Sequence, residues 1–358
     1  EFVIKTKQND SYPYPVYNGG RTNTGFYDKY NNEGNKILVS ARGNAGFVNI
    51  IKTRYWAGNS CYSIDIIDKN KNNVDFTYYE MKLKENVFIK NQQSATIPSV
   101  SKSAVENIEL LTPLIQEQTK IGSFLATIDA LISETEKELE ACREQKRGML
   151  QKMFPKNGAD IPEIRFPGFT DAWEQRKLKE TIEYIVDNRG KNPDYYCSEG
   201  IPVIDNFMIR NSLYPDLNTA TRFIDENLYQ NFIRKYNEED DILLTLVGNG
   251  IGNITLFPKD KAVIIQNTLG FRAKEDKKFL FFLLMANNEA LVKLDRGMAQ
   301  PSIRQDEILD LDIYVPSNSE QTQIGEYFSN LDNLITLHQR ELDRLLELKK
   351  GFMQKMFC

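Results

Sequence analysis

The chain has 358 residues, of which 41% are hydrophobic and 27% charged, and this is the composition of a globular protein with room for two domains. No apolar run approaches the about 20 residues that cross a bilayer, and four scattered cysteines with one histidine, His338, exclude a zinc-ligand set, so we expect a cytoplasmic protein without a metal or a membrane partner. The net charge is −5, with 14 Lys and Arg against 11 Asp and Glu in residues 1–112 and 19 against 25 in residues 161–315, so a nucleic-acid ligand requires a basic cleft or a basic partner.

The first predicted module covers residues 1–112 and is rich in β-strand patterns. The sequence YNGGRTNTGFY (17–27) combines turn-forming glycines with hydrogen-bond donors, and Tyr17 and Phe26 are expected in the core. The sequence ILVSARGNAGFVNI (37–50) has the pattern of a strand, a glycine-rich turn and a second strand.

A long helix is predicted over residues 113–157. Apolar residues recur every three or four positions from Ile121 to Met153, and no proline interrupts them. A helix of about 38 residues is roughly 57 Å long. Such a stripe is too long to be buried by one small domain.

The second predicted module covers residues 158–315. Its sequence ILLTLVGNGIGNI (242–254) repeats the pattern of strand, glycine turn and strand. GNGIGN (248–253) resembles a nucleotide-binding loop, but a strand follows it instead of a helix, so we reject that interpretation. NPDYY (192–196) lacks the second proline of an adenine methyltransferase motif, and no Walker A loop is present, so we do not expect an enzyme.

A second long helix is predicted over residues 316–358, and it repeats the first. A shift of 203 residues aligns 113–154 with 316–357 at 18 identities in 42 positions, ending in QKMF both times. This is a duplication, and the simplest way to bury both stripes is to pack the helices antiparallel, with a module at each end. Thr135 and His338 occupy matching positions, where we expect a polar layer that sets the register.

Over nearly its whole length the chain resembles the specificity (HsdS) subunits of type I restriction-modification systems. The features that carry the resemblance are the paired EQTKIG…QKMF and EQTQIG…QKMF helices and the segment IPEIRFPGFTDAWEQRKL (161–178). The resemblance implies an α/β (α+β) fold with two β-rich target-recognition domains, separated by two long antiparallel coiled-coil helices in a pseudo-twofold repeat. It further implies a non-catalytic reader of a bipartite site in double-stranded DNA, with one half read by each domain.

The resemblance also implies partners. Two modification (methyltransferase) subunits dock on the helices and restriction (endonuclease and translocase) subunits join them, and S-adenosylmethionine, ATP and Mg²⁺ belong to those subunits and not to this chain. The residues expected to bind the modification subunits are Ile121, Leu125, Ile128, Ile324, Phe328 and Leu331.

Candidate DNA-binding residues are Asn, Arg, Lys and Thr side chains on the turns of both modules, because these types read base edges or hold phosphates. In the first module they are Asn18, Arg21, Thr22, Asn23, Arg42, Asn44, Lys52 and Arg54, and in the second Asn206, Arg210, Asn211, Asn249, Asn253, Asn267, Arg296 and Arg304. Each of them alone is equally consistent with a solvated loop residue.

The first repeat departs from the family pattern. It has 155 residues against 203 in the second (156–358), and the difference of 48 includes any counterpart of RFPGFTDAWEQRKL. The first module is therefore expected to be short at its N-terminus, either through truncation or by nature. The competing interpretation of the whole chain is a coiled-coil adaptor whose modules bind proteins instead of DNA.

Overall fold

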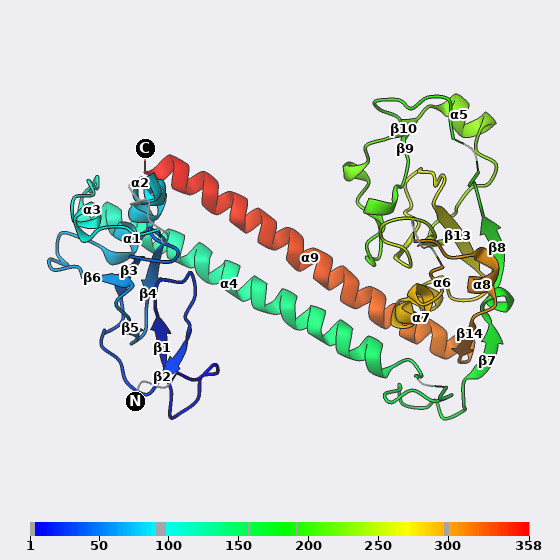
Figure 1. The fold of residues 1–358 in the computed structure, drawn as a ribbon, viewed down its shortest axis with the longest axis horizontal. Helices are drawn as coiled ribbons and strands as arrows, with labels where there is room; N and C mark the ends of the chain where they lie inside the picture. The colour runs from blue at the N-terminus through cyan, green and yellow to red at the C-terminus, as the bar shows by residue number, and fades with distance from the viewer. Residues whose placement is uncertain (1–3, 91–97, 157, 191, 297–300, 358) are drawn as a thin grey trace. The chain divides into compact units, whose positions relative to one another are not determined.

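The computed structural model describes residues 4–90, 98–156, 158–190, 192–296 and 301–357. The chain divides into two compact units, unit 1 (Glu1–Glu136 and Arg340–Cys358) and unit 2 (Lys137–Gln339). Two long helices, α4 (Ile115–Lys152) and α9 (Asn318–Met356), each begin in one unit and end in the other (Figure 1). The predicted fold class, a mixture of sheets and long repeated helices, is confirmed.

The described residues of unit 1 form two small sheets and three short helices besides the unit's parts of α4 and α9. One sheet has the order β2-β1-β5 and the other β4-β3-β6. The strands are β1 (Tyr14–Tyr17), β2 (Gly25–Tyr27), β3 (Lys36–Ser40), β4 (Val48–Ile51), β5 (Trp56–Ala57) and β6 (Cys61–Ile64), and the helices are α1 (Val74–Leu83), α2 (Glu85–Lys90) and α3 (Lys102–Glu106). Strand β3 is the centre of the unit because four of its five residues are buried.

Unit 2 is built on a four-stranded antiparallel sheet of order β12-β11-β13-β8, with the pairs β10-β9 and β14-β7 beside it. The strands are β7 (Glu174–Lys177), β8 (Ile182–Val186), β9 (Ile201–Pro202), β10 (Phe223–Ile224), β11 (Ile242–Thr245), β12 (Ile254–Leu256), β13 (Thr268–Ala273) and β14 (Asp312–Val315). The α-helices are α5 (Glu226–Asn231), α6 (Lys277–Ala286), α7 (Asn288–Val292) and α8 (Gln305–Leu309), and short 3-10 turns lie at Leu178–Thr181, Asn206–Met208 and Leu217–Thr219. Helix α6 is buried over Phe279–Leu284 and supplies much of the core.

The duplication extends beyond the long helices into both units. Helices α1 and α6 are related by the same shift of 203 residues as α4 and α9, and so are α3 and α8. Strands β4, β3 and β6 have the same order and antiparallel pairing as β12, β11 and β13. Each unit is therefore one copy of the same small fold, and the sequence repeat detects only its most conserved part.

Each long helix is anchored at its start by a short helix of its own unit. Asn73 caps α1 by accepting a bond from the Phe76 amide at 3.0 Å, and Asp276 caps α6 in the same way from Phe279 at 2.7 Å. A Cβ added to Gly122 would lie 2.8 Å from Asn73 Oδ1, and one added to Gly325 would lie 2.7 Å from Asp276 Oδ1. The repeated glycine is thus required because the cap of one helix lies against the surface of the other.

Each long helix ends against an aromatic side chain of the opposite unit's short helix. In unit 1, Phe357 stacks on Phe76 of α1, with ring centroids 5.0 Å apart. In unit 2, Phe154 lies 6.0 Å from Phe279 of α6, which is the residue that corresponds to Phe76. The repeated QKMF sequence is therefore a second anchor, and it fixes the end of each helix in the unit where the other helix begins.

Between these anchors the helices pack antiparallel within each unit. In unit 2, Lys146 of α4 holds Asp332 of α9, with Nζ–O distances of 2.6 and 2.8 Å. In unit 1, Lys349 of α9 pairs with Asp129 of α4. Lys146 and Lys349 are repeat counterparts, as are Asp129 and Asp332, so one ion pair occurs twice.

The segment 161–178 covers one side of unit 2. Arg165 forms two bonds of 2.7 Å to Glu320, which is fully buried, and Trp173 packs edge-on against Phe154. Strand β7 then pairs with β14. In unit 1 the counterpart of Glu320 is Glu117, which is exposed, so this covering layer distinguishes the two units within the described residues.

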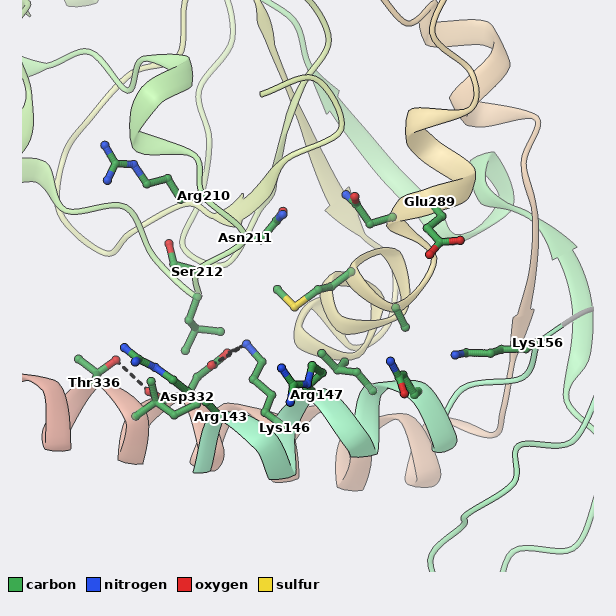
Figure 2. A pocket seen from close by; sticks show the side chains of 17 residues that line it. Arg143, Lys146, Arg147, Lys156, Arg210, Asn211, Ser212, Glu289, Asp332 and Thr336 are labelled. Atoms are coloured by element: carbon green, nitrogen blue, oxygen red, sulfur yellow. Dashed lines mark hydrogen bonds and ion pairs between the residues drawn. The ribbon is translucent and has the colours of Figure 1, made fainter. Parts of the chain in front are cut away.

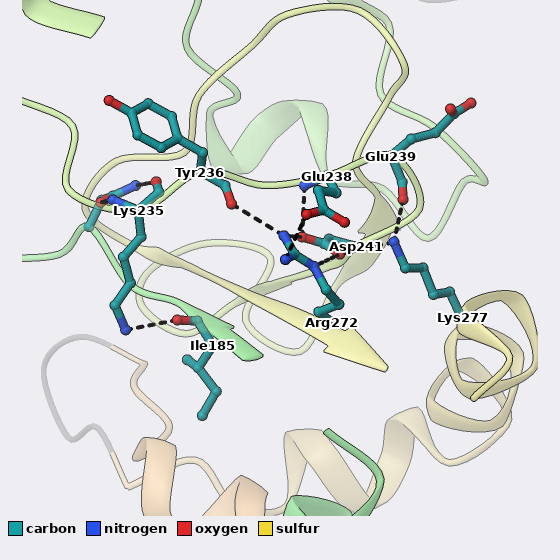
Figure 3. Close-up of polar contacts among 9 residues, drawn as sticks. Ile185, Lys235, Tyr236, Glu238, Glu239, Asp241, Arg272 and Lys277 are labelled. Atoms are coloured by element: carbon teal, nitrogen blue, oxygen red, sulfur yellow. Dashed lines mark hydrogen bonds and ion pairs between the residues drawn. The ribbon is translucent and has the colours of Figure 1, made fainter. Parts of the chain in front are cut away.

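A buried acid joins the two central strands of the larger sheet in unit 2. Asp241, directly before β11, is fully buried and accepts bonds from the guanidinium of Arg272 in β13 at 3.0 and 3.1 Å (Figure 3). The backbone amide of Glu238 donates to the same carboxylate at 2.8 Å, and Lys277 Nζ lies 3.3 Å from it. This network fixes the start of β11, the strand that leads into the glycine turn at residues 247–252.

Candidate nucleic-acid interface

In unit 1 the glycine turn at residues 42–46 is the meeting point of three other loops. The Asn44 amide donates to the Gly19 carbonyl at 2.9 Å, and the Ala41 amide donates to the Ser60 carbonyl at 2.8 Å. The Val100 amide donates to the Ala41 carbonyl at 2.9 Å. These bonds bring residues 18–24, 41–46, 58–61 and 98–100 together at one end of the β4-β3-β6 sheet, a cluster that we call the unit 1 turn face.

The thiol of Cys61 packs beneath the unit 1 turn face and accepts a hydrogen bond from it. The backbone amide of Gly19 donates to Cys61 Sγ at 3.0 Å. Burial raises the pKa of the Cys61 thiol, and the Gly19 bond opposes this only in part. The thiol therefore stays protonated at neutral pH and acts as a packing group and acceptor, not as a reactive nucleophile.

Several of the predicted side chains are exposed on the unit 1 turn face. Arg42 and Asn44 are exposed on the glycine turn, and the guanidinium of Arg21 lies over the ring of Phe47 at 5.8 Å. Asn18 and Thr22 are also exposed, whereas Asn23 is half-buried and donates to the Gly25 carbonyl at 3.3 Å. The face thus presents two arginines and several amide or hydroxyl groups, the types that contact phosphates and base edges.

Lys52 and Arg54 do not share this arrangement. Lys52 is paired with Asp75 in the first turn of α1. Arg54 donates to Glu33 at 2.8 Å and stacks on the ring of Tyr30 at 4.7 Å. Both cations are neutralised by acids of their own unit, so they are weaker candidates than Arg21 and Arg42.

In unit 2 the predicted asparagines mostly tie loops together. Asn206 donates to the Val247 carbonyl at 2.7 Å, and Asn253 donates to the Ile209 carbonyl at 3.1 Å. Asn211, in the left-handed region at φ 57°, bonds Asn253 and accepts from the Ile254 amide at 2.9 Å. These side chains have little capacity left for a ligand, because they hold residues 206–212 against the glycine turn at residues 247–252. We call these two segments the unit 2 turn face.

The exposed positions of unit 2 lie on either side of that framework. Asn249 is exposed on the glycine turn at the place of Asn44, and Arg210 is exposed on the adjoining loop. Arg304 is paired with Asp306 at 2.7 Å and Arg296 with Glu307, so both are partly neutralised. Asn249 and Arg210 are therefore the strongest of the predicted residues here.

A polar hollow beside the same turn contains residues that the sequence alone did not single out. Its volume is about 330 Å³, and it is lined by Arg189, Gly190, Asn192, Val247, Gln266 and the predicted Asn267. Arg189 is oriented by Asp187 and by Gln305 at 2.7 Å, and its bonds lower the pKa of the Asp187 carboxyl. No single motif marks this hollow, because its lining residues come from three separate segments.

The residues predicted to bind modification subunits lie mainly inside the chain's own packing. Leu125, Ile324 and Phe328 are at most 2% exposed, Ile128 and Leu331 are also buried, and Ile121 is half-buried. The apolar side chains that the long helices expose are instead Phe124, Leu131, Leu334, Leu337, Leu346 and Leu348. Docking through the six predicted residues stays a prediction, but burial favours the second set.

Comparison with known proteins decides the family. Residues 2–141 and 170–347 match the family model described as the type I restriction modification DNA specificity domain. The type I restriction enzyme MjaVIII specificity subunit of Methanocaldococcus jannaschii is 30% identical over 90% of this chain and 78% of its own length. The chain belongs to the type I specificity-subunit family.

Further relatives agree with this assignment. The Mycoplasma pneumoniae protein S.MpnORF507P is 30% identical over 97% of this specificity subunit and 89% of its own length. The crystal structure of the type I restriction-modification S subunit from M. genitalium has the same fold, with a TM-score of 0.74 over 100% of this chain and 94% of that chain at 18% identity. In the described part of the specificity subunit, no helix is both long and apolar enough to cross a membrane.

Proposed function

We propose that this specificity subunit reads a bipartite site in double-stranded DNA, one half with the turn face of each unit. The observation that carries the proposal is that one fold occurs twice with unlike side chains on the same turn, ARGNAG in unit 1 and LVGNGIG in unit 2. A constant scaffold with two different reading surfaces suits a site with two different halves. The helices α4 and α9, which pass between the units, set the number of base pairs between those halves.

The proposal assigns the chemistry to other subunits. Two modification subunits dock on the exposed apolar side chains of α4 and α9, and restriction subunits join them in the cytoplasm. S-adenosylmethionine, ATP and Mg²⁺ are brought by these partners, and this chain contributes no catalytic residue. Support comes from membership of the specificity-subunit family and from the exposed leucines on both helices, such as Leu337 at 60%.

The decisive test uses one substitution on each turn face. Arg42→Ala removes an exposed cation from unit 1, and Asn249→Ala removes an exposed amide from unit 2. We expect each variant, in complex with its modification subunit, to relax recognition at one half-site only, with a cost of about 1–3 kcal/mol per lost base contact. Sequencing of methylated adenines in cells that carry each variant measures this directly.

Asn211→Ala is the control for damage to the fold, because the side-chain amide of Asn211 bonds both Asn253 and the Ile254 amide and so ties two loops together. Uniform weakening at both half-sites by Arg42→Ala would contradict the proposal. The adaptor interpretation makes a separate prediction, namely that the complex never shifts a DNA duplex in a sequence-dependent way at any salt concentration.

A further inference from the structure

An open groove in unit 2 concentrates positive charge on a protein whose overall charge is negative. Its volume is about 670 Å³, and it is bounded by the last turns of α4 on one side and by the loop 210–213 and helix α7 on the others (Figure 2). The cations that line it are Arg143, Lys146, Arg147, Lys156 and Arg210, and the acids are Glu289 and Asp332.

Within the described residues, most of these cations are not closely paired with an acid. Lys146 is the exception, because its ammonium is held by the buried Asp332. Arg143 donates to the neutral amide of Gln339 at 2.9 Å, and Arg147 lies 3.9 Å from Glu144 with 71% of its side chain exposed. Lys156 is exposed and forms no ion pair with the described residues.

The repeat separates the structural charge of this groove from the charge that is available to a ligand. The Lys146–Asp332 pair recurs in unit 1 as Lys349–Asp129, so helix packing requires it. Arg143, by contrast, corresponds to Leu346, which is 46% exposed. Packing of the helices therefore does not require a cation at that position, and its presence in unit 2 needs another explanation.

The shape of the groove indicates the kind of ligand. Arg143, Arg147 and Gln151 follow one another at intervals of four residues, which places them in a row with a spacing of about 6 Å along α4. The opposite side carries Arg210 and Ser212, which lie at the edge of the unit 2 turn face (Figure 2). An open row of two guanidinium groups and a carboxamide suits an extended polyanion better than a single small anion.

We propose that this groove holds the sugar-phosphate backbone of the DNA next to the half-site that unit 2 reads. The inference rests on the proposed function and adds to it, because it gives the C-terminal turns of α4 a direct role in binding the duplex. Arg147 and Lys156 contact phosphates, and Arg210 continues the contact toward the unit 2 turn face. Sequence is read elsewhere, so the groove contributes affinity and not specificity.

The test is the salt dependence of DNA binding by the complex of this chain with its modification subunits. The double variant Arg147→Gln/Lys156→Gln is compared with Lys137→Gln, which removes an exposed cation of α4 outside the groove. The probes are a duplex that carries the methylated site and a scrambled duplex of equal length. We expect the slope of log K against log salt to become shallower by about 1.8, or about 0.9 for each phosphate contact.

The same double variant should weaken binding to both duplexes by an equal factor and leave the methylated sequence unchanged. A slope equal to that of Lys137→Gln would overturn the inference, and so would a groove variant that binds DNA normally but no longer co-purifies with an acidic protein partner. Failure of the proposed function would give a different result, because the wild-type complex would then bind the methylated site and the scrambled duplex equally well.

Discussion

Four glycines of the long helices belong to the repeated sequence, but they differ in whether the structure has room for a side chain at their position. Gly122 and Gly325 face the caps of α1 and α6, where a Cβ would lie 2.8 and 2.7 Å from a side-chain oxygen. Gly148 and Gly351 have no neighbouring atom within 4 Å of the Cβ position. A glycine in a helix interior without a packing reason only lowers the stability of that helix.

This difference predicts opposite effects of alanine on stability. Gly122→Ala and Gly325→Ala should each lower the free energy of unfolding by about 1–3 kcal/mol, because the added methyl group displaces a capping side chain. Gly148→Ala and Gly351→Ala should raise it by about 0.5–1 kcal/mol. Urea unfolding followed by circular dichroism measures all four, and a uniform sign across the set would contradict this assignment.

At the scale of the elements, the duplicated ion pair has two different environments. The side chains of Lys146 and Asp332 are 12% and 9% exposed, whereas those of Lys349 and Asp129 are 22% and 33% exposed. Burial raises the pKa of Asp332 above its ordinary 3.8, although Lys146 opposes this shift. The same two residue types should therefore contribute unequally to the pairing of the helices.

Removing one partner tests this inequality. Lys146→Met leaves a carboxylate uncompensated in the interior and should cost about 3–5 kcal/mol at neutral pH, while Lys349→Met should cost about 1 kcal/mol or less. Because the folded pKa of Asp332 is raised, folding takes up a proton there, and the deficit of Lys146→Met should shrink as the pH falls toward 3.8. Equal losses in the two variants, measured by chemical denaturation, would show that burial is not the cause.

Periodicity predicted the long helices well because their pattern is local. The predicted spans 113–157 and 316–358 contain the observed helices Ile115–Lys152 and Asn318–Met356. What covers each apolar stripe depends on residues far away in the sequence. For that reason periodicity alone does not show that Leu125 and Phe328, two of the predicted partner-binding residues, are buried in the chain's own core.

The candidate site was predictable in part for the same reason. The glycine turns are local patterns, and Arg42 and Asn249 lie on them as exposed residues. Whether a side chain is available to a ligand depends on residues far away in the sequence. Lys52 forms an ion pair with Asp75, and Asn253 donates to the Ile209 carbonyl. Arg189 and Gln266 come together with Asn267 only in the folded unit, so no motif could have identified their hollow.

At the scale of the whole molecule, the division into units falls in the middle of both long helices, between residues 136 and 137 and between 339 and 340. The turn faces and the anchors of both helices lie on either side of these points. Seven residues inserted at both points should therefore lengthen each helix by about 10 Å without altering a reading surface. At roughly 3.4 Å per base pair this corresponds to a spacer about three base pairs longer.

Methylated sites mapped in cells that carry the insertion variant should show the same two half-sites at the wider spacing. Insertion into α4 alone serves as the control, since it breaks the antiparallel match of the helices and should abolish methylation. Altered half-sites in the double insertion would mean that the helices do more than separate the units.

The twofold recurrence of the lysine–aspartate pair has a consequence for symmetry. Each long helix carries one lysine and one aspartate of this pair. Asp332 and Lys349 of α9 could therefore pair with Lys349 and Asp332 of a second, antiparallel copy of α9. A polypeptide limited to residues 158–358 should consequently self-associate about a twofold axis, with two identical ion pairs across the interface, as isologous contacts require. Sedimentation of that fragment as a dimer, and recognition of a palindrome by its complex, would indicate that the present chain arose by fusion and divergence of two identical halves.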